Sequence, residues 1–173
     1  MTTTTTNQLN DVEIATVGSL IDACRREPAT AETVWSATVH WKGGFASEAK
    51  VRDFDPIASD EPAGLGGADT APNPVEQLLG ALGNCLAVGY AANATAAGIE
   101  LTGLRIDLDG DLNLETFLGI DDGHAGYDAI RVRVHVESDA EPEKIDELHR
   151  KVVASSPVGH TLTRAIPVEF ALS

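Results

Sequence analysis

The sequence predicts an α+β fold in which antiparallel strands pack against a long apolar helix. Residues 104–109 and 130–136 alternate strictly between apolar and polar side chains, as antiparallel strands with one buried face do. A continuous run rich in Leu, Ala and Gly, from Pro74 to about residue 97, predicts the helix. With 173 residues and 43% hydrophobic content, the chain can form one domain with its own core.

The N-terminal region is predicted to hold a tail and one short helix. Residues 1–10 have neither the basic nor the apolar segment of an export signal, so we expect a disordered tail. Residues 11–28 are expected to form a helical extension that ends before a proline. Four residues recur there at helical spacing: Ile14, Val17, Ile21 and Cys24. The rest of the chain, residues 29–173, is expected to be the single main domain.

A hairpin and a long loop are predicted next. Residues 33–41 and 45–51 are rich in β-branched and aromatic side chains and flank Lys42-Gly43-Gly44, which is typical of a β-hairpin. Residues 53–72 contain three of the eight prolines of the chain and three glycines. We therefore expect an ordered loop without regular structure, suited to form the wall of a site.

The long helix is expected to be buried on several sides. It begins at Asn73-Pro74 and ends before Gly98, which matches the preferences of helix starts and ends. One face is bulky: Leu78, Leu82, Cys85 and Leu86. A second face is small: Gly80, Gly83, Ala87, Ala91 and Ala94. Because glycine weakens a helix, the small face indicates close approach of another element, in a domain or dimer core rather than in a membrane.

The C-terminal part is predicted to add a loop, a helix and a strand. Residues 119–127 contain three glycines and two aspartates, which indicates a loop that could reach a site. A helix is expected to begin at Pro142 and to stop before Ser155-Ser156-Pro157. Residues 166–172 alternate again and predict a closing strand, with Pro167 indicating a sheet edge.

Charge and cysteine content exclude several classes of protein. The 27 acidic and 12 basic side chains give a formal charge of −15, which repels nucleic acids and anionic membranes. The two cysteines form no Cys-x-x-Cys pair, so we expect no disulfide scaffold, no metal site and a cytoplasmic location. No cofactor is expected. The acidic run at residues 107–111 is interpreted as a solvated strand face rather than a calcium loop.

An ordered set of motifs over about residues 33–173 resembles a known family. The set comprises the hairpin, the Gly66-Gly67 loop, Asn73-Pro74-Val-Glu-Gln-Leu-Leu with Cys85, Gly98-Ile, Gly110-Asp-Leu-Asn-Leu and Ser156-Pro157-Val158. It resembles the family of osmotically inducible protein C (OsmC) and organic hydroperoxide resistance (Ohr) proteins. The resemblance implies an OsmC-like α+β fold, with antiparallel sheets wrapped around long central helices in an intertwined dimer.

The resemblance also implies roles for particular residues. Family members that reduce organic hydroperoxides use a peroxidatic cysteine, a resolving cysteine in a later Cys-Pro motif and an Arg–Glu pair. Cys85 stands at the peroxidatic position, whereas Ser156 stands at the resolving position and cannot form a disulfide. The glutamate position is Val75, and Glu76 is displaced by one residue, or about 100° around a helix. Arg52 is a displaced candidate for the arginine.

The residues themselves leave the role of the central thiol open. A cation, a metal or a helix N-terminus favours a reactive thiolate, whereas Cys85 is predicted in the middle of an apolar helix. Cys85 is therefore either a small core residue or a nucleophile. His160 is either a surface histidine or a base that reaches Cys85. Cys24 continues a helical stripe, yet it is the one other thiol that could act as a resolving partner.

Two functions from different classes remain. The first is thiol-dependent reduction of organic hydroperoxides by Cys85, which Cys24 or an external thiol then reduces. The second is a small-molecule binding protein, or an enzyme of another reaction class, that uses the pocket at the dimer interface. The expected partners are a second copy in a homodimer, a hydroperoxide or other small apolar ligand, and an external thiol, with no nucleic acid and no membrane. The candidate catalytic residues are Cys85, Arg52, Glu76, His160 and Ser156.

Overall fold

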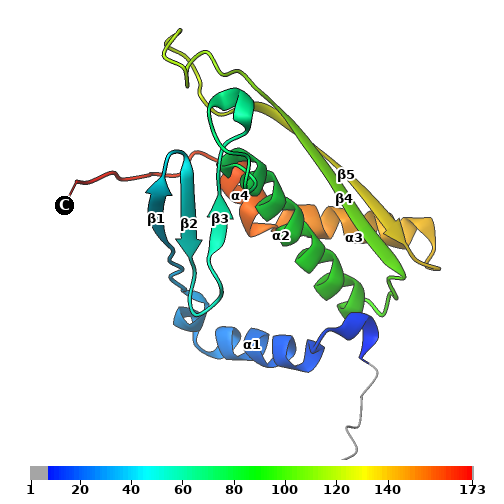
Figure 1. The fold of residues 1–173 in the computed structure, drawn as a ribbon. Coiled ribbons are helices and arrows are strands. Elements are labelled where there is room, and N and C mark those ends of the chain that lie inside the picture. Colours follow the sequence, from blue (N-terminus) through cyan, green and yellow to red (C-terminus); the bar gives the residue numbers. More distant parts are fainter. Residues whose placement is uncertain (1–7, 173) are drawn as a thin grey trace, which may run out of the picture. The chain divides into compact units, whose positions relative to one another are not determined.

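The computed structural model describes residues 8–172, and Figure 1 shows their helices and strands coloured along the sequence. These residues separate into two compact units. One unit comprises residues 8–14 and 79–172, and the other comprises Ala15–Leu78. A disordered tail is predicted for residues 1–10, and residues 1–7 of it lie outside the described part of the chain. The sequence predicts a single main domain over residues 29–173. The division into two units does not test that expectation, which stays a prediction.

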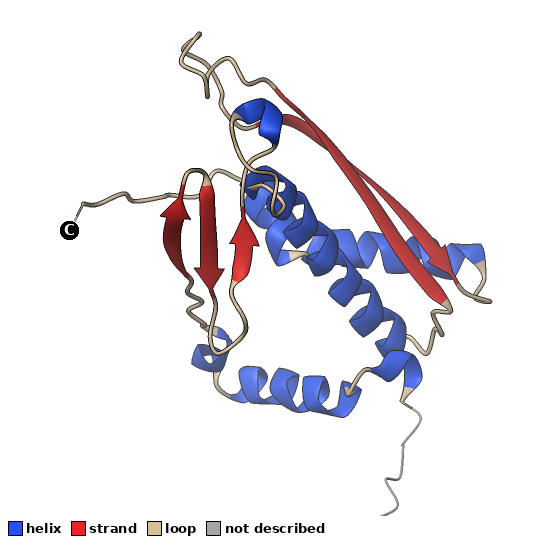
Figure 2. Cartoon of the chain, in the orientation of Figure 1, coloured by secondary structure: helices blue, strands red, loops and turns tan. Residues whose placement is uncertain are grey.

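The Ala15–Leu78 unit contains the predicted helix and hairpin. Its elements are α1 (Ile14–Arg26), η2 (Pro28–Ala31), β1 (Thr38–Gly43), β2 (Ala46–Lys50), β3 (Ile57–Ser59), η3 (Ala63–Leu65) and the first turn of α2 (Pro74–Ala96). The three strands form an antiparallel sheet in the order β1-β2-β3, drawn in red in Figure 2. The helix within residues 11–28 and the hairpin are confirmed. The prediction of a loop without regular structure is wrong at β3, because the second edge of β2 pairs with it.

A buried carboxylate organises the loop that follows β3. Asp60 is only 2% exposed and accepts hydrogen bonds from the backbone N–H groups of Glu61 (2.8 Å), Ala68 (3.2 Å) and Thr70 (3.2 Å). The Thr70 hydroxyl donates a fourth, at 2.8 Å. This hydroxyl, followed by the backbone donors, holds the pKa of Asp60 below its usual value. The loop is therefore folded around an ionised side chain whose oxygens are all used.

The other unit joins the long helix to a two-stranded sheet. Its elements are η1 (Leu9–Asp11), α2 from Leu79 onward, β4 (Gly103–Leu112), β5 (Tyr127–Glu137), α3 (Pro142–Ser155) and α4 (Pro157–Thr163). β4 and β5 pair antiparallel from Gly103↔Glu137 to Leu112↔Tyr127, which confirms both predicted strands. The predicted helices are confirmed as α2 and α3.

The core of this unit lies between α2, α3 and the apolar face of the β4–β5 sheet. The buried apolar side chains are Leu82, Leu86, Tyr90, Ala94, Ile99, Leu148 and Val152. Close approach to the small face of α2 is confirmed at Gly83, where an added Cβ would lie 2.9 Å from the Leu108 side chain. At Gly80 an added Cβ would have no neighbour within 4 Å in this chain, so close approach there stays a prediction for a dimer core.

The outer face of the β4–β5 sheet carries paired charges. Arg131 donates to Asp109 at 2.6 Å and to Asp111 at 2.9 Å, and it lowers the pKa of both carboxyl groups. Arg133 also donates to Asp109, at 2.7 Å. The acidic run is thus a charge-paired strand face, as its alternation indicated.

Both ends of the described chain differ from the sequence predictions. Asn10, expected in the tail, donates to the carbonyl of Ile99 at 2.9 Å and accepts from the N–H of Leu101 at 2.8 Å. The strand predicted for residues 166–172 is wrong, because within residues 8–172 that segment pairs with no other strand. Alternation favours a strand, but a strand forms only where a neighbouring edge accepts its hydrogen bonds.

Across residues 8–172, no helix combines the length and apolar character needed to cross a bilayer.

We predict that Gly67→Ala destabilises the Asp60 loop. A Cβ at Gly67 would lie 1.8 Å from the carbonyl oxygen of Glu61, so the backbone must move. Overpacking of this kind costs about 1–3 kcal/mol. Gly64→Ala is the matched control, because a Cβ there meets nothing within 4 Å. Urea unfolding followed by circular dichroism measures both variants, and equal midpoints would contradict the prediction.

Candidate functional site

The central thiol lies against a serine from a distant part of the chain. Cys85 on α2 is partly buried, and its Sγ lies 3.3 Å from Oγ of Ser156. The two residues occupy the positions that resemble the peroxidatic and resolving positions. The structure therefore brings together two of the five candidate residues directly.

The serine is held in place by a helix cap. Ser156 is 4% exposed and lies between α3 and α4, where its Oγ accepts a hydrogen bond from the N–H of Gly159 at 3.1 Å. Pro157 occupies the first turn of α4, where its missing N–H costs nothing. Because the oxygen accepts from the backbone, the hydroxyl hydrogen is free to point at the sulfur. When Cys85 is a thiolate, Ser156 is the donor in this contact, since a thiolate can only accept.

His160, the third candidate residue in this unit, lies in α4 just after the Ser156 cap. The backbone N–H of His160 donates to the carbonyl of Ser156 at 2.9 Å, so His160 lies in the first turns of α4. Its partly buried side chain lines the same cavity as Ser156.

The other two candidates belong to the Ala15–Leu78 unit and have local structural partners. Glu76 accepts from the N–H of Asn73 at 2.9 Å, and Asn73 Oδ1 accepts from the N–H of Glu76 at 2.9 Å. This reciprocal pair is a capping box at the start of α2. Arg52 has a left-handed backbone (φ 49°), and its guanidinium lies 4.6 Å from the centre of the Phe54 ring.

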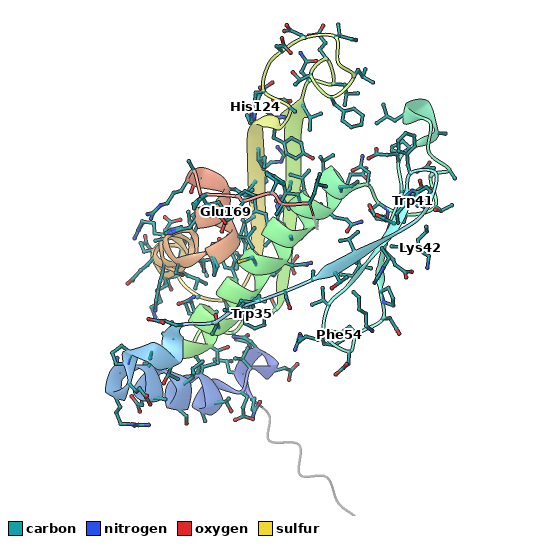
Figure 3. The ribbon with its side chains drawn as sticks, turned by 90° about the vertical axis from the view of Figure 1, so that its left-hand side faces the viewer. Trp35, Trp41, Lys42, Phe54, His124 and Glu169 are labelled. Carbon is teal, nitrogen blue, oxygen red and sulfur yellow. The ribbon has the colours of Figure 1, made fainter. Side chains whose placement is uncertain are left out.

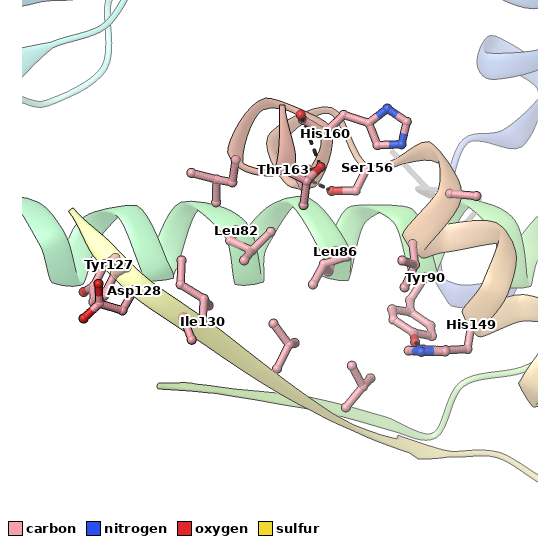
Figure 4. Close-up of a pocket in the computed structure, with 17 residues that line it drawn as sticks. Leu82, Leu86, Tyr90, Tyr127, Asp128, Ile130, His149, Ser156, His160 and Thr163 are labelled. Atoms are coloured by element: carbon pink, nitrogen blue, oxygen red, sulfur yellow. Dashed lines mark hydrogen bonds between the residues drawn. The ribbon is translucent and has the colours of Figure 1, made fainter. Parts of the chain in front are cut away.

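A cavity of about 750 Å³ lies between α2, β5, α3 and α4 (Figure 4). Its middle is apolar and includes Leu82, Leu86 and Ile130. Ser156 lines it, so the cavity extends to the residue that contacts Cys85. Polar residues line the α4 side of the cavity and both of its ends. Ser156, His160 and Thr163 lie on the α4 side. Tyr127 and Asp128 lie at one end, and Tyr90 and His149 lie at the other.

Tyr90 and His149 were not predicted as functional residues. The Tyr90 hydroxyl is hydrogen-bonded to Nδ1 of His149, and burial raises the pKa of Tyr90. Tyr90 continues the spacing of Leu82 and Leu86 on α2, so the helical pattern could have indicated it. No sequence pattern links it to His149 on α3.

Within the described residues, 8–172, no three His, Cys, Asp or Glu side chains gather as metal ligands.

The architecture and the thiol site define an α+β protein with a cysteine on its long central helix. A model of the OsmC-like protein family matches residues 66–171, and the chain therefore belongs to the OsmC-like protein family.

Solved structures show the same fold at low sequence identity. An OsmC-like protein from Mycoplasma pneumoniae is 19% identical with a TM-score of 0.66, over 76% of this chain and 89% of that chain. The organic hydroperoxide resistance protein OsmC from Legionella pneumophila is 15% identical with a TM-score of 0.58, over 76% and 91%. An organic hydroperoxide resistance protein from Elizabethkingia anophelis is 17% identical with a TM-score of 0.55, over 75% and 89%. A comparison with curated protein sequences gives no match.

We predict that Ser156→Ala lowers the free energy of unfolding by about 1 kcal/mol, because the α4 cap is lost. Ser155→Ala is the matched control. Its hydroxyl donates back to the carbonyls of Lys151 and Val152 within α3, so its removal should be nearly neutral. Chemical denaturation of both variants measures the difference. Equal stabilities would show that Ser156 does not act as a cap.

Proposed function

We propose that this protein reduces organic hydroperoxides in a thiol-dependent reaction through Cys85. Membership of the OsmC-like family supports the proposal, as does the fold shared with proteins named for organic hydroperoxide resistance. The observation that carries it is the 3.3 Å contact between Cys85 Sγ and Ser156 Oγ. A sulfur beside a hydroxyl group that lines a cavity is better suited to react than one enclosed by apolar groups.

The proposed reaction begins with the Cys85 thiolate. The sulfur attacks the terminal oxygen of the hydroperoxide, the S–O bond forms and the O–O bond breaks. The alkoxide leaves and takes up a proton to become an alcohol, while Cys85 becomes a sulfenic acid. Ser156 contacts the sulfur before the attack, and its hydroxyl donates to the thiolate.

An external thiol completes the proposed cycle. Ser156 cannot form a disulfide, so a thiol in solution attacks the sulfenic acid and releases water. A second thiol then attacks the mixed disulfide, which restores Cys85 and yields an external disulfide. Cys24 lies on α1 in the Ala15–Leu78 unit and remains the internal alternative as a reductant.

A second candidate function is binding of a small molecule, or another reaction class, without peroxidase chemistry. The capping box favours it, because the Glu76 carboxylate is already used by the N–H of Asn73. In this reading the cavity binds its ligand and Cys85 is a structural side chain.

We predict that one equivalent of cumene hydroperoxide adds one oxygen atom to the wild-type protein, at Cys85. Intact mass spectrometry measures the addition, and dithiothreitol should reverse it. Cys85→Ser should show no addition, whereas Cys24→Ser should behave like the wild type. Ser156→Cys should instead lose two hydrogen atoms, because the introduced thiol lies close enough to form a disulfide with Cys85.

Each outcome separates the two candidates. An inert wild-type protein would overturn the peroxidase proposal and favour the binding protein. An internal disulfide in the wild type, abolished by Cys24→Ser, would show that Cys24 is the resolving thiol.

We also propose that the protein is a homodimer. Large apolar side chains are exposed in both units, among them Trp35 (78%), Trp41 (75%) and Phe170 (92%). Figure 3 labels both tryptophans. Trp35 precedes β1, and Trp41 lies in β1. Exposed apolar surface of this extent is typical of a protein interface.

We predict a dimer at micromolar concentration in light scattering, because these side chains become buried between copies. Trp41→Lys should raise the proportion of monomer, since it places a charge at the interface. His40→Lys is the matched control on the opposite face of β1. A monomeric wild-type protein would contradict the proposal.

A further inference from the structure

A buried phenol and an exposed imidazole form a pair at one end of the cavity. Tyr90 on α2 is fully buried, whereas His149 on α3 is exposed. The Tyr90 hydroxyl is hydrogen-bonded to His149 Nδ1, and the two ring centres are 6.2 Å apart with 32° between the planes. Figure 4 shows the pair at the opposite end of the apolar stripe from Tyr127 and Asp128. The reaction proposed for Cys85 uses neither residue.

The hydrogen bond to Tyr90 uses Nδ1 of the imidazole and leaves Nε2 available. Burial raises the pKa of Tyr90, so its phenol keeps its proton, and the tautomer of His149 decides whether Nδ1 accepts that proton in a hydrogen bond. A neutral imidazole that accepts at Nδ1 carries its own hydrogen at Nε2. Since His149 lines the cavity and is exposed, Nε2–H is, in that tautomer, a donor available to a ligand.

The rest of the cavity indicates the charge of that ligand. Among the described residues that line it, none is Lys or Arg, while Asp128 stands at the far end. The net charge of −15 adds a general repulsion of anions. The walls between the two ends are apolar, including Leu86, Ile130 and Val153, and such walls disfavour an ionic ligand. A volume of about 750 Å³ lies within the usual range of sites for small molecules.

We propose that this cavity binds a neutral, largely apolar molecule with a carbonyl oxygen that accepts a hydrogen bond from His149 Nε2. The apolar body of the ligand lies along Leu82 and Leu86. Tyr90 is a positioning residue, because it holds the imidazole in the tautomer that donates. The site goes beyond the proposed peroxidase function, since binding there requires no reaction at Cys85.

Three probes of similar shape test the ligand class. Benzylacetone has the carbonyl, butylbenzene lacks it, and hydrocinnamate replaces it with a carboxylate. Titrations followed by the imidazole ¹⁵N signals of the protein should give a dissociation constant for benzylacetone about fivefold lower than for butylbenzene, as expected for one neutral hydrogen bond. Hydrocinnamate should bind more weakly than benzylacetone. Saturable shifts should appear at His149 Nε2.

Variants test the roles of the two residues. His149→Leu should bind benzylacetone and butylbenzene equally. Tyr90→Phe should reduce the preference for the ketone and shift the His149 ¹⁵N signals toward the other tautomer, an effect that a merely structural role would not produce. His135→Gln is the control and should leave the binding of all three probes unchanged. His135 pairs with Asp107 on the charged face of the β4–β5 sheet and does not line the cavity.

The proposal is overturned if none of the probes binds, if hydrocinnamate binds most tightly, or if His149→Leu keeps the preference for the ketone. Addition of oxygen to Cys85 is measured separately, by intact mass spectrometry. Failure of the peroxidase proposal and failure of this one are therefore seen independently.

Discussion

Burial of one face of α2 is the interaction on which the rest of the larger unit depends. Leu82, Leu86 and Tyr90 recur at intervals of four residues and are between 0% and 7% exposed. Each such side chain contributes about 1.5–3 kcal/mol when buried. The partners that bury them are the apolar face of the β4–β5 sheet and α3. Because this stripe places α2 beside both elements, it also sets where Cys85 and the cavity lie.

The contact between the thiol and the serine follows from that packing and from one helix cap. Ser156 ends α3 and begins α4, so its position is held by two helices rather than by a flexible loop. Its oxygen is already used by the N–H of Gly159, which orients the hydroxyl hydrogen. The residue therefore has a structural reason to be a serine besides its contact with Cys85. A cysteine at this position would make a weaker cap, since sulfur is a poor acceptor.

Local patterns predicted most of the elements, and long-range geometry accounts for the errors. The periodicities of α2, β4 and β5 are properties of the segments themselves, and the structure confirms them. β3 has only three residues and depends on the free edge of β2, so no periodicity could indicate it. Residues 166–172 show the opposite case, a strand pattern that pairs with no other strand within residues 8–172. Two local signals were present but not interpreted: Asn73 to Glu76 is a capping box, and Ser156-Pro157 is typical of a helix start.

The candidate site was less predictable than the fold because its parts come from separate helices. The resemblance placed Cys85 and Ser156 at related positions, but the cap that orients the serine required α4, which was not predicted. The Tyr90–His149 pair depends on how α3 lies against α2, and neither residue stands in a recognisable motif. A fully buried phenol needs a hydrogen-bond partner, since an unpaired buried hydroxyl costs about 1–3 kcal/mol. His149 supplies that partner, so the core of the unit itself holds a polar group at the end of an otherwise apolar cavity. Stability and the proposed ligand recognition are thus linked through one hydroxyl, because the hydrogen bond that satisfies the buried Tyr90 also contacts the imidazole of His149.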